Sequence, residues 1–241
     1  MTYTLDLHCH TISSGHGYST VTENAAHAAA IGLTHIGMAD HAPGMPGGAH
    51  RYHFLNMGAV PEYIHGVRIL KGIEANILNP QGELDFPQEY LAKMEFVIAS
   101  MHREVIPPAN CEANTAALVN AMENPHVHIL GHPHNGMYPI DIAAVVAAAA
   151  RTHTIIEINN HSLIPGSFRY GGEAAFVETL RLCKEYQVSI LASSDAHYHT
   201  SVGNFHLAKP LIEASGIPEA LVVNTSIERL QAAIARKKES A

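Results

Sequence analysis

The chain has 241 residues and a formal net charge of -8, from 14 Lys and Arg against 22 Asp and Glu. This length suits one large domain with a single core, and we expect residues 1–241 to form it. The acidic balance offers no basic face, so neither a long nucleic acid nor a membrane is expected as a partner. With three cysteines, no CxxC pair and no signal peptide pattern, we expect a cytoplasmic location without disulfides or a thiolate zinc site.

Histidine is the unusual feature of the composition, because its 19 residues outnumber Lys and Arg together. Packing alone does not require so many imidazoles. Histidine is the commonest metal ligand and the side chain that titrates near neutral pH. The excess therefore indicates metal binding or acid–base chemistry.

Short apolar segments rich in β-branched residues recur along the chain and predict strands. They cover residues 3–7, 34–39, 67–73, 96–101, 127–131, 154–156 and 188–194. Helical patterns accompany them at residues 22–31, 114–123, 140–151, 173–186 and 226–238. Apolar strands that alternate with helices indicate a parallel sheet covered by helices, either open and doubly wound or closed into a barrel.

Each predicted strand is followed by, or ends in, a polar residue with ligand chemistry. In chain order these residues are His8, His41, Glu74, His102, His132, Glu157 and Asp195. Their spacing is close to the roughly 30 residues of a βαβ unit. In a closed barrel the carboxyl ends of all strands meet at one mouth, whereas an open sheet would spread them along an edge. We therefore predict an α/β fold of the (β/α)7 barrel type, similar to a TIM barrel.

Two short motifs place pairs of candidate ligands on one strand face. Residues i and i+2 of a strand point the same way, which pairs His8 with His10 and Asp195 with His197. His16 follows in the glycine-containing loop after the first strand. With the residues at the other strand ends, the candidate ligands are His8, His10, His16, His41, Glu74, His102, His132, Asp195 and His197.

This ligand set predicts more than one metal ion. A single ion takes about four to six ligands, so the set is large enough for two or three ions with a bridging carboxylate. It is rich in nitrogen and contains no thiolate, which suits Zn, Mn or Fe better than Mg or Ca.

The motifs resemble the PHP family (polymerase and histidinol phosphatase domain), and most closely its small stand-alone members, the YcdX-type probable phosphatases. The resemblance covers nearly the whole chain, from Asp6-Leu7-His8-Cys9-His10 through Asp40-His41, Gly72-Ile73-Glu74, His132-Pro133 and Glu157-Ile158-Asn159 to Ser194-Asp195-Ala196-His197. It implies a distorted seven-stranded barrel with three divalent metal ions at its mouth, with zinc preferred and manganese or iron as alternatives.

The resemblance also implies how the ligands divide among three sites. The first ion is assigned to His8, His10, Glu74 and Asp195. Glu74 then bridges to a second ion, assigned to His102 and His132, and the third ion is assigned to His16, His41 and His197.

A phosphate group needs countercharges beyond the metals, and the planar fork of arginine meets two oxygens at once. Candidates in the loops of the mouth are Arg51, Arg103 and Arg169, of which Arg169 is preferred. We assign catalytic roles to Glu74, Asp195 and Arg169.

Four further polar residues lie near the ends of the predicted strands. Asp6 shares a face with His8 and His10 by strict alternation, so either it orients one of them or its role is purely structural. Glu157 and Asn159 could hydrogen-bond ligands or substrate, whereas Lys71 lies on the opposite strand face from Glu74 and is expected away from the site.

Hydrolysis of a small phosphomonoester by in-line attack of a metal-bound hydroxide is the favoured function, with no covalent protein intermediate. One alternative is a phosphodiesterase or nucleotidase acting on small nucleotides. An amidohydrolase is another, but that family usually bridges its metals with a lysine or carboxylate on the fourth strand, where this chain has His102. A non-catalytic metal-binding module is the third, although such modules tend to lose ligands and none is missing here. Assembly into a homo-oligomer is left open.

Overall fold

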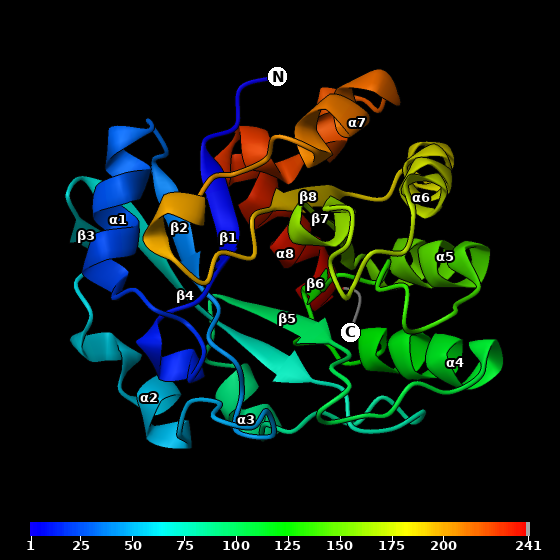
Figure 1. The fold of residues 1–241 in the computed structure, drawn as a ribbon, viewed down its shortest axis with the longest axis horizontal. Coiled ribbons are helices and arrows are strands. Elements are labelled where there is room, and N and C mark those ends of the chain that lie inside the picture. The colour runs from blue at the N-terminus through cyan, green and yellow to red at the C-terminus, as the bar shows by residue number, and fades with distance from the viewer. Residues whose placement is uncertain (240–241) are drawn as a thin grey trace.

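A parallel sheet that curls almost into a barrel organises the chain in the computed structural model, which describes residues 1–239 (Figure 1). Neighbouring strands along the sheet are β1 (Leu5–Cys9), β2 (His35–Met38), β4 (Val67–Asn76), β5 (Phe96–Ser100), β6 (Ile129–Leu130), β7 (Ile155–Asn159) and β8 (Ile190–Ser193). Each of these strands is parallel to its neighbour. The predicted distorted β/α barrel is confirmed.

One strand was not predicted from the sequence. The short β3 (Tyr63–Ile64) pairs antiparallel with the start of β4. The two residues between them, His65 and Gly66, both have positive φ angles, of 52° and 80°. Two consecutive positive φ angles are typical of the tight turn that joins antiparallel strands. Two strand residues are too few to show a periodic pattern, so this hairpin could not be predicted from periodicity.

The five helices predicted from periodicity are present with small shifts at their ends. They are α1 (Val21–Ala30), α4 (Cys111–Met122), α5 (Ile142–Thr152), α6 (Glu173–Tyr186) and α8 (Ile227–Glu239). Side chains of Thr20, Asn110 and Asp141 accept hydrogen bonds from backbone N–H groups in the first turns of α1, α4 and α5, which fixes where these helices begin.

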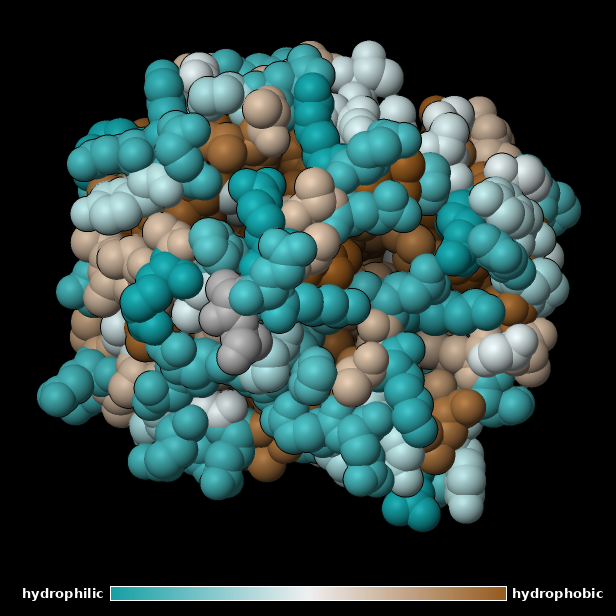
Figure 2. Space-filling model, turned by 180° about the vertical axis from the view of Figure 1, so that it is seen from behind, coloured by the Kyte–Doolittle hydropathy of each residue, from teal (hydrophilic) through white to brown (hydrophobic). Residues whose placement is uncertain are grey.

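Three shorter helices, α2 (Arg51–Leu55), α3 (Gln88–Leu91) and α7 (Ala208–Ala214), were not predicted. Within residues 1–239, no helix combines the length and the apolar character needed to cross a bilayer. The face seen in Figure 2 is mostly hydrophilic, and its apolar side chains lie largely in recesses between polar ones.

The interior of the barrel is filled by strand side chains and sealed by α8. Leu5, Ile98, Ile129 and Leu191, from four different strands, belong to one buried apolar cluster. Leu230 of α8 packs into the same cluster. Burial of the apolar surface of each side chain of this size stabilises the fold by about 1.5–3 kcal/mol. The apolar filling leaves only the opposite end of the barrel, at the carboxyl ends of the strands, for polar side chains.

The barrel is distorted where β1 meets β8. The carboxyl ends of the two strands are joined by backbone hydrogen bonds, from His10 N to Ala196 O at 2.8 Å and from Ala196 N to His8 O at 3.2 Å. Further back, the side chain of Asn224 lies between the strands. Its Nδ2 donates to Leu5 O and Ala192 O, and its Oδ1 accepts from Ala192 N. At this boundary between β1 and β8, the seam of the barrel, an amide side chain thus replaces strand pairing.

A β-bulge in β1 sets the direction of the first candidate ligands. Asp6 pairs with Ile36 and Cys9 with Met38, so two residues, Leu7 and His8, stand opposite Gly37 alone. A Cβ at Gly37 would lie 2.4 Å from Leu7 O, so the close approach requires glycine. The bulge shifts the alternation by one residue, and His8 points into the barrel together with Leu7.

Candidate metal centre

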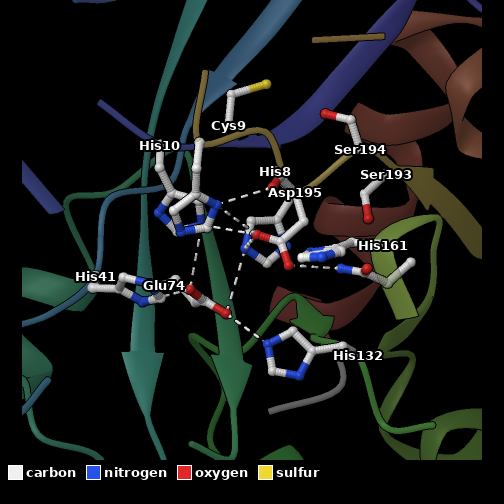
Figure 3. Close-up of polar contacts among 12 residues, drawn as sticks. His8, Cys9, His10, His41, Glu74, His132, His161, Ser193, Ser194 and Asp195 are labelled. Atoms are coloured by element: carbon white, nitrogen blue, oxygen red, sulfur yellow. Dashed lines mark hydrogen bonds and ion pairs between the residues drawn. The ribbon is translucent and has the colours of Figure 1, made fainter. Parts of the chain in front are cut away.

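Glu74, at the end of β4, is the buried centre of a group of imidazoles (Figure 3). Its Oε1 lies 3.0 Å from Nε2 of His132, 3.3 Å from Nε2 of His8 and 3.4 Å from Nε2 of His102. Its Oε2 lies 2.7 Å from Nδ1 of His41 and 3.6 Å from Nε2 of His10. One carboxylate therefore contacts five imidazoles that come from four strands, β1, β2, β5 and β6, or the loops after them.

Asp195 is the second carboxylate of this group and follows β8. Its Oδ1 lies 3.1 Å from Nε2 of His10 and 3.6 Å from both Nε2 of His8 and Nδ1 of His197. Asp195 has a φ of 54°, a left-handed conformation that aspartate tolerates better than most residues. This backbone turn lets Asp195 and His197, two residues apart, both face the mouth.

His16 completes the predicted set from its loop after β1. Its ring stacks on His41 and His197, with centroids 4.9 and 4.6 Å apart. All nine predicted ligand residues therefore lie together at one mouth. Ligand atoms of three subsets lie within 4.8 Å of one another, namely His8 with His10 and Glu74, His41 with Glu74 and His102, and His10 with His41 and His197.

Hydrogen bonds fix which ring nitrogen of three imidazoles faces the cluster. His8 Nδ1 donates to Glu157 Oε1 at 2.6 Å, His102 Nδ1 donates to Asn76 Oδ1 at 2.7 Å, and His197 Nδ1 donates to the carbonyl of Asp195 at 3.0 Å. Because each partner is an acceptor, the proton lies on Nδ1 and a lone pair is available on Nε2. This is the arrangement of metal-binding histidines, whose other nitrogen donates to a carboxylate or carbonyl.

Several buried polar atoms of the cluster form no hydrogen bond of good geometry in the described part of the chain, although Nδ1 of His41 and Oε2 of Glu74 lie 2.7 Å apart. These buried atoms are His8 Nε2, His41 Nδ1, Glu74 Oε2, His102 Nε2 and His197 Nε2. Burying such atoms unpaired costs free energy, which a bound cation would offset. Imidazole nitrogens and carboxylate oxygens are ligands that zinc and similar ions accept. The residues present therefore fit divalent metal ions.

The charges of the cluster also favour a cation. Burial acts to raise the pKa of Glu74, but the imidazoles of His8, His102 and His41 hold it well below its usual range. Burial acts to lower the pKa of His8, but the carboxylates of Glu157, Asp195 and Glu74 raise it well above its ordinary value. Carboxylates that favour a proton on this imidazole favour a divalent cation at the same place.

Glu157 on β7 orients two of the candidate ligands. Besides His8 Nδ1, its Oε1 accepts from Ser193 Oγ at 2.6 Å. Its Oε2 accepts from the backbone N of His132 at 2.5 Å and from Asn159 Nδ2 at 3.2 Å. The sequence placed Glu157 and Asn159 on this face, and the structure shows which residues they contact.

Two orienting residues were missed from the sequence. Asn76 holds His102, and its own Nδ2 donates to Asp85 Oδ2 at 2.6 Å. Asn76 is two residues after Glu74 on the same strand, so the alternation rule would have found it. Ser14 contacts His10 Nδ1 at 3.1 Å from the loop after β1, where no periodic pattern exists.

Asp6 does not orient a histidine ring and has the structural role of the two that the sequence left open, whereas the face shared with His8 and His10 that strict alternation predicted was wrong. It points away from the mouth, where it accepts from Ser194 Oγ at 2.5 Å and from the backbone N of Gly203 at 2.8 Å. The bulge in β1 is the cause, since it places Asp6 and His8 on opposite sides of the strand. Lys71 lies away from the site as predicted, donating from Nζ to Val60 O.

A cavity of about 460 Å³ opens beside the cluster. Arg103 and Arg169, two of the three arginine candidates, line it, whereas Arg51 lies outside it with its guanidinium 5.5 Å from the ring of Tyr52. Arg169 is buried and donates to Oδ2 of Asp195 and, at 3.2 Å, to Nδ1 of His161. The preferred arginine therefore lies against a candidate ligand.

Fold and site together define a distorted β/α barrel with a histidine and carboxylate centre at its mouth. The chain matches the PHP domain family over residues 6–213 and belongs to that family. It is 44% identical to a protein named probable phosphatase from Acetivibrio thermocellus, over 99% of this chain and 98% of that protein. It is 46% identical to another protein of this name from Thermoanaerobacter sp. (strain X514), over 99% of this chain and 97% of that protein.

A solved structure supports the fold. The crystal structure of histidinol phosphate phosphatase from Lactococcus lactis, complexed with zinc, L-histidinol and phosphate, resembles this chain with a TM-score of 0.65. The two sequences are 19% identical, and the match covers 90% of this chain and 95% of the other.

Proposed function

We propose that the protein is a metal-dependent phosphomonoesterase that acts on small phosphorylated substrates. The single observation that carries the proposal is the convergence of buried, unpaired ligand atoms, with the tautomers of His8, His102 and His197 fixed so that Nε2 faces the cluster. The names of the relatives and the zinc and phosphate in the Lactococcus lactis structure support the same activity.

The proposed centre holds three divalent ions, with zinc preferred over manganese or iron. His8, His10, Glu74 and Asp195 would hold the first ion. Glu74 would bridge to the second, held also by His102 and His132, and His16, His41 and His197 would hold the third. When bound, clustered divalent ions lower the pKa of a water molecule toward neutrality and neutralise phosphoryl oxygens, which serves in-line attack on phosphorus.

Arg169 is proposed to bind the phosphoryl group. One terminal nitrogen of its guanidinium is occupied by Asp195 and His161, while the buried Nε has no hydrogen-bond partner within residues 1–239. The other N–H groups of the Arg169 guanidinium therefore remain available to donate hydrogen bonds to phosphoryl oxygens at the edge of the cavity. Preorganised donors aimed at oxygens that gain charge are a large source of transition-state stabilisation.

The test begins with protein purified without added metal, whose metal content is measured by elemental analysis. Hydrolysis of p-nitrophenyl phosphate and bis(p-nitrophenyl) phosphate is then measured before and after chelation, and again after zinc or manganese is restored. We expect activity on the monoester that chelation abolishes and metal restores. Activity that survives complete removal of metal would refute the proposal, and faster hydrolysis of the diester would favour a phosphodiesterase.

Two histidine variants test whether a loss of activity comes from the metal centre or from the general loss of an imidazole. His102→Ala is expected to lower kcat/KM on the monoester at least 100-fold, because it removes a predicted metal ligand. His126→Ala is the matched control, since His126 precedes β6 at the other end of the barrel and should leave the activity unchanged. Equal effects of the two substitutions would argue against the centre.

A further inference from the structure

One part of the cavity lining is polar and another part is apolar. His41, His102, Asp195 and His197 form the polar side of the lining. Facing solvent, the lining also includes Met45, Pro46, Met137 and Phe168. Phe168 is 61% exposed, as several other aromatic residues are, and is distinguished from them by its position in the lining of this cavity.

Two guanidinium groups and an imidazole lie close to the ring of Phe168. The guanidinium carbons of Arg169 and Arg103 lie 5.4 and 5.8 Å from its centroid. The ring of His161 meets it nearly perpendicularly, at 88° and 6.4 Å. Because Arg169 is anchored on Asp195, Phe168 is connected through one side chain to the candidate centre.

The charges around the apolar part of the lining are already paired. Arg103 Nε donates to Glu104 Oε1 at 2.8 Å, and Arg169 is paired with Asp195. This apolar part therefore offers no unpaired charge to a second anionic group of a substrate. Its two methionines and its phenylalanine are polarisable and pack well against a flat unsaturated ring. A polyol placed on these apolar side chains would lose hydrogen bonds to water, although Glu104, Asn135 and His161 offer polar partners elsewhere in the lining.

We propose that Phe168, with Met45 and Met137, forms the subsite for the leaving group and selects phosphomonoesters whose alcohol carries a planar, uncharged ring. This inference rests on the proposed phosphomonoesterase function and adds the class of substrate. A cavity of about 460 Å³ has room for such a ring beside the phosphate. Phe168 determines specificity here, while the chemistry at phosphorus belongs to the centre beneath.

The experiment compares 2-phenylethyl phosphate with glycerol 1-phosphate, which both release a primary alcohol. Steady-state kinetics are measured for the wild type, Phe168→Ala and Phe168→Tyr. Tyr170→Ala is the matched control, because Tyr170 is an exposed aromatic residue of the same loop that does not line the cavity. Titration calorimetry of the metal-loaded proteins with 3-phenylpropylphosphonate and methylphosphonate gives a binding readout without turnover.

We expect Phe168→Ala to raise KM for 2-phenylethyl phosphate about three- to tenfold more than KM for glycerol 1-phosphate, as the loss of one ring stack predicts. Phe168→Tyr should restore the preference, and the phosphonates should show the same difference in Kd. Equal effects on both esters and both phosphonates would overturn the subsite while leaving the phosphatase intact. Absence of hydrolysis of all monoesters, with phenylpropylphosphonate still preferred over methylphosphonate, would overturn the phosphatase and leave the ring subsite standing.

Discussion

Replacing Glu157 by glutamine should weaken metal binding far more than it weakens the fold. The carboxylate accepts four hydrogen bonds, two on each oxygen. A glutamine keeps one oxygen, so its amide group must face one of the two pairs of donors. The donors at Oε2 are the backbone N of His132 and the amide of Asn159, which cannot become acceptors there. The glutamine amide is therefore expected at the position of Oε1.

At that position the amide faces His8 and Ser193. The hydroxyl of Ser193 can rotate to accept, but His8 must change tautomer so that Nδ1 accepts and Nε2 carries the proton. A protonated Nε2 cannot bind a metal ion. Loss of such an orienting partner typically costs 10- to 100-fold in metal affinity, or about 1.4–2.8 kcal/mol. The metal-free fold loses only about 1 kcal/mol, the difference between a charge-assisted and a neutral hydrogen bond.

The two effects are measured separately. Zinc affinity is obtained by competition with a chelator of known affinity, and the stability of the metal-free protein by urea unfolding. Glu185→Gln on α6 is the control, because Glu185 is exposed, bonds to Arg181, and should change neither quantity by more than about 0.5 kcal/mol. Zinc affinity of Glu157→Gln within threefold of the wild type would refute this account of how His8 is oriented.

Three further substitutions test other parts of the structure. Arg169→Lys should lower kcat/KM for a phosphomonoester about 100-fold, since a point charge replaces the fork, and unchanged kinetics would exclude Arg169 from phosphate binding. Phe176→Ala on α6 should cost about 3–5 kcal/mol in urea unfolding, because the buried ring stacks on His134 at 4.0 Å; a cost below 1 kcal/mol would contradict that packing. Burial lowers the pKa of His128 to about 3, and the positive charge of Lys238 adds to this. Between about pH 6.5 and 3, His128 is therefore protonated in the unfolded chain but not in the folded protein. In this range the group makes the free energy of unfolding decrease by about 1.4 kcal/mol for each pH unit by which the pH is lowered. In metal-free protein His128→Asn should flatten that slope, and an identical slope would disprove the burial argument.

The sequence predicted the site better than it predicted the details of the fold. His132 and Glu74 were found because each closes an apolar run, and in a barrel such ends meet whatever the lengths of the loops between them. Periodicity located the long helices, including α6, because a helical pattern needs several turns to be visible. It failed for α3, whose four residues make about one turn.

Features that arise when distant segments of the chain pack together could not be predicted from the sequence. The alternation in Leu5-Asp6-Leu7-His8 reads as a regular strand, and only pairing with β2 across Gly37 inserts the bulge. Asn224 lies more than 200 residues from Leu5, and no local pattern indicates that its amide fills the seam of the barrel. These contacts depend on tertiary structure, which propensity and spacing do not describe.

The seam between β1 and β8 has a consequence for biosynthesis. His8 and His10 are synthesised well before Asp195, His197 and Asn224, which follow them by more than 180 residues. Contacts of such long sequence separation form late, because the intervening chain must be ordered first. Complete assembly of the centre must therefore await synthesis as far as His197, and a nascent chain halted before residue 195 lacks two of the nine candidate ligands.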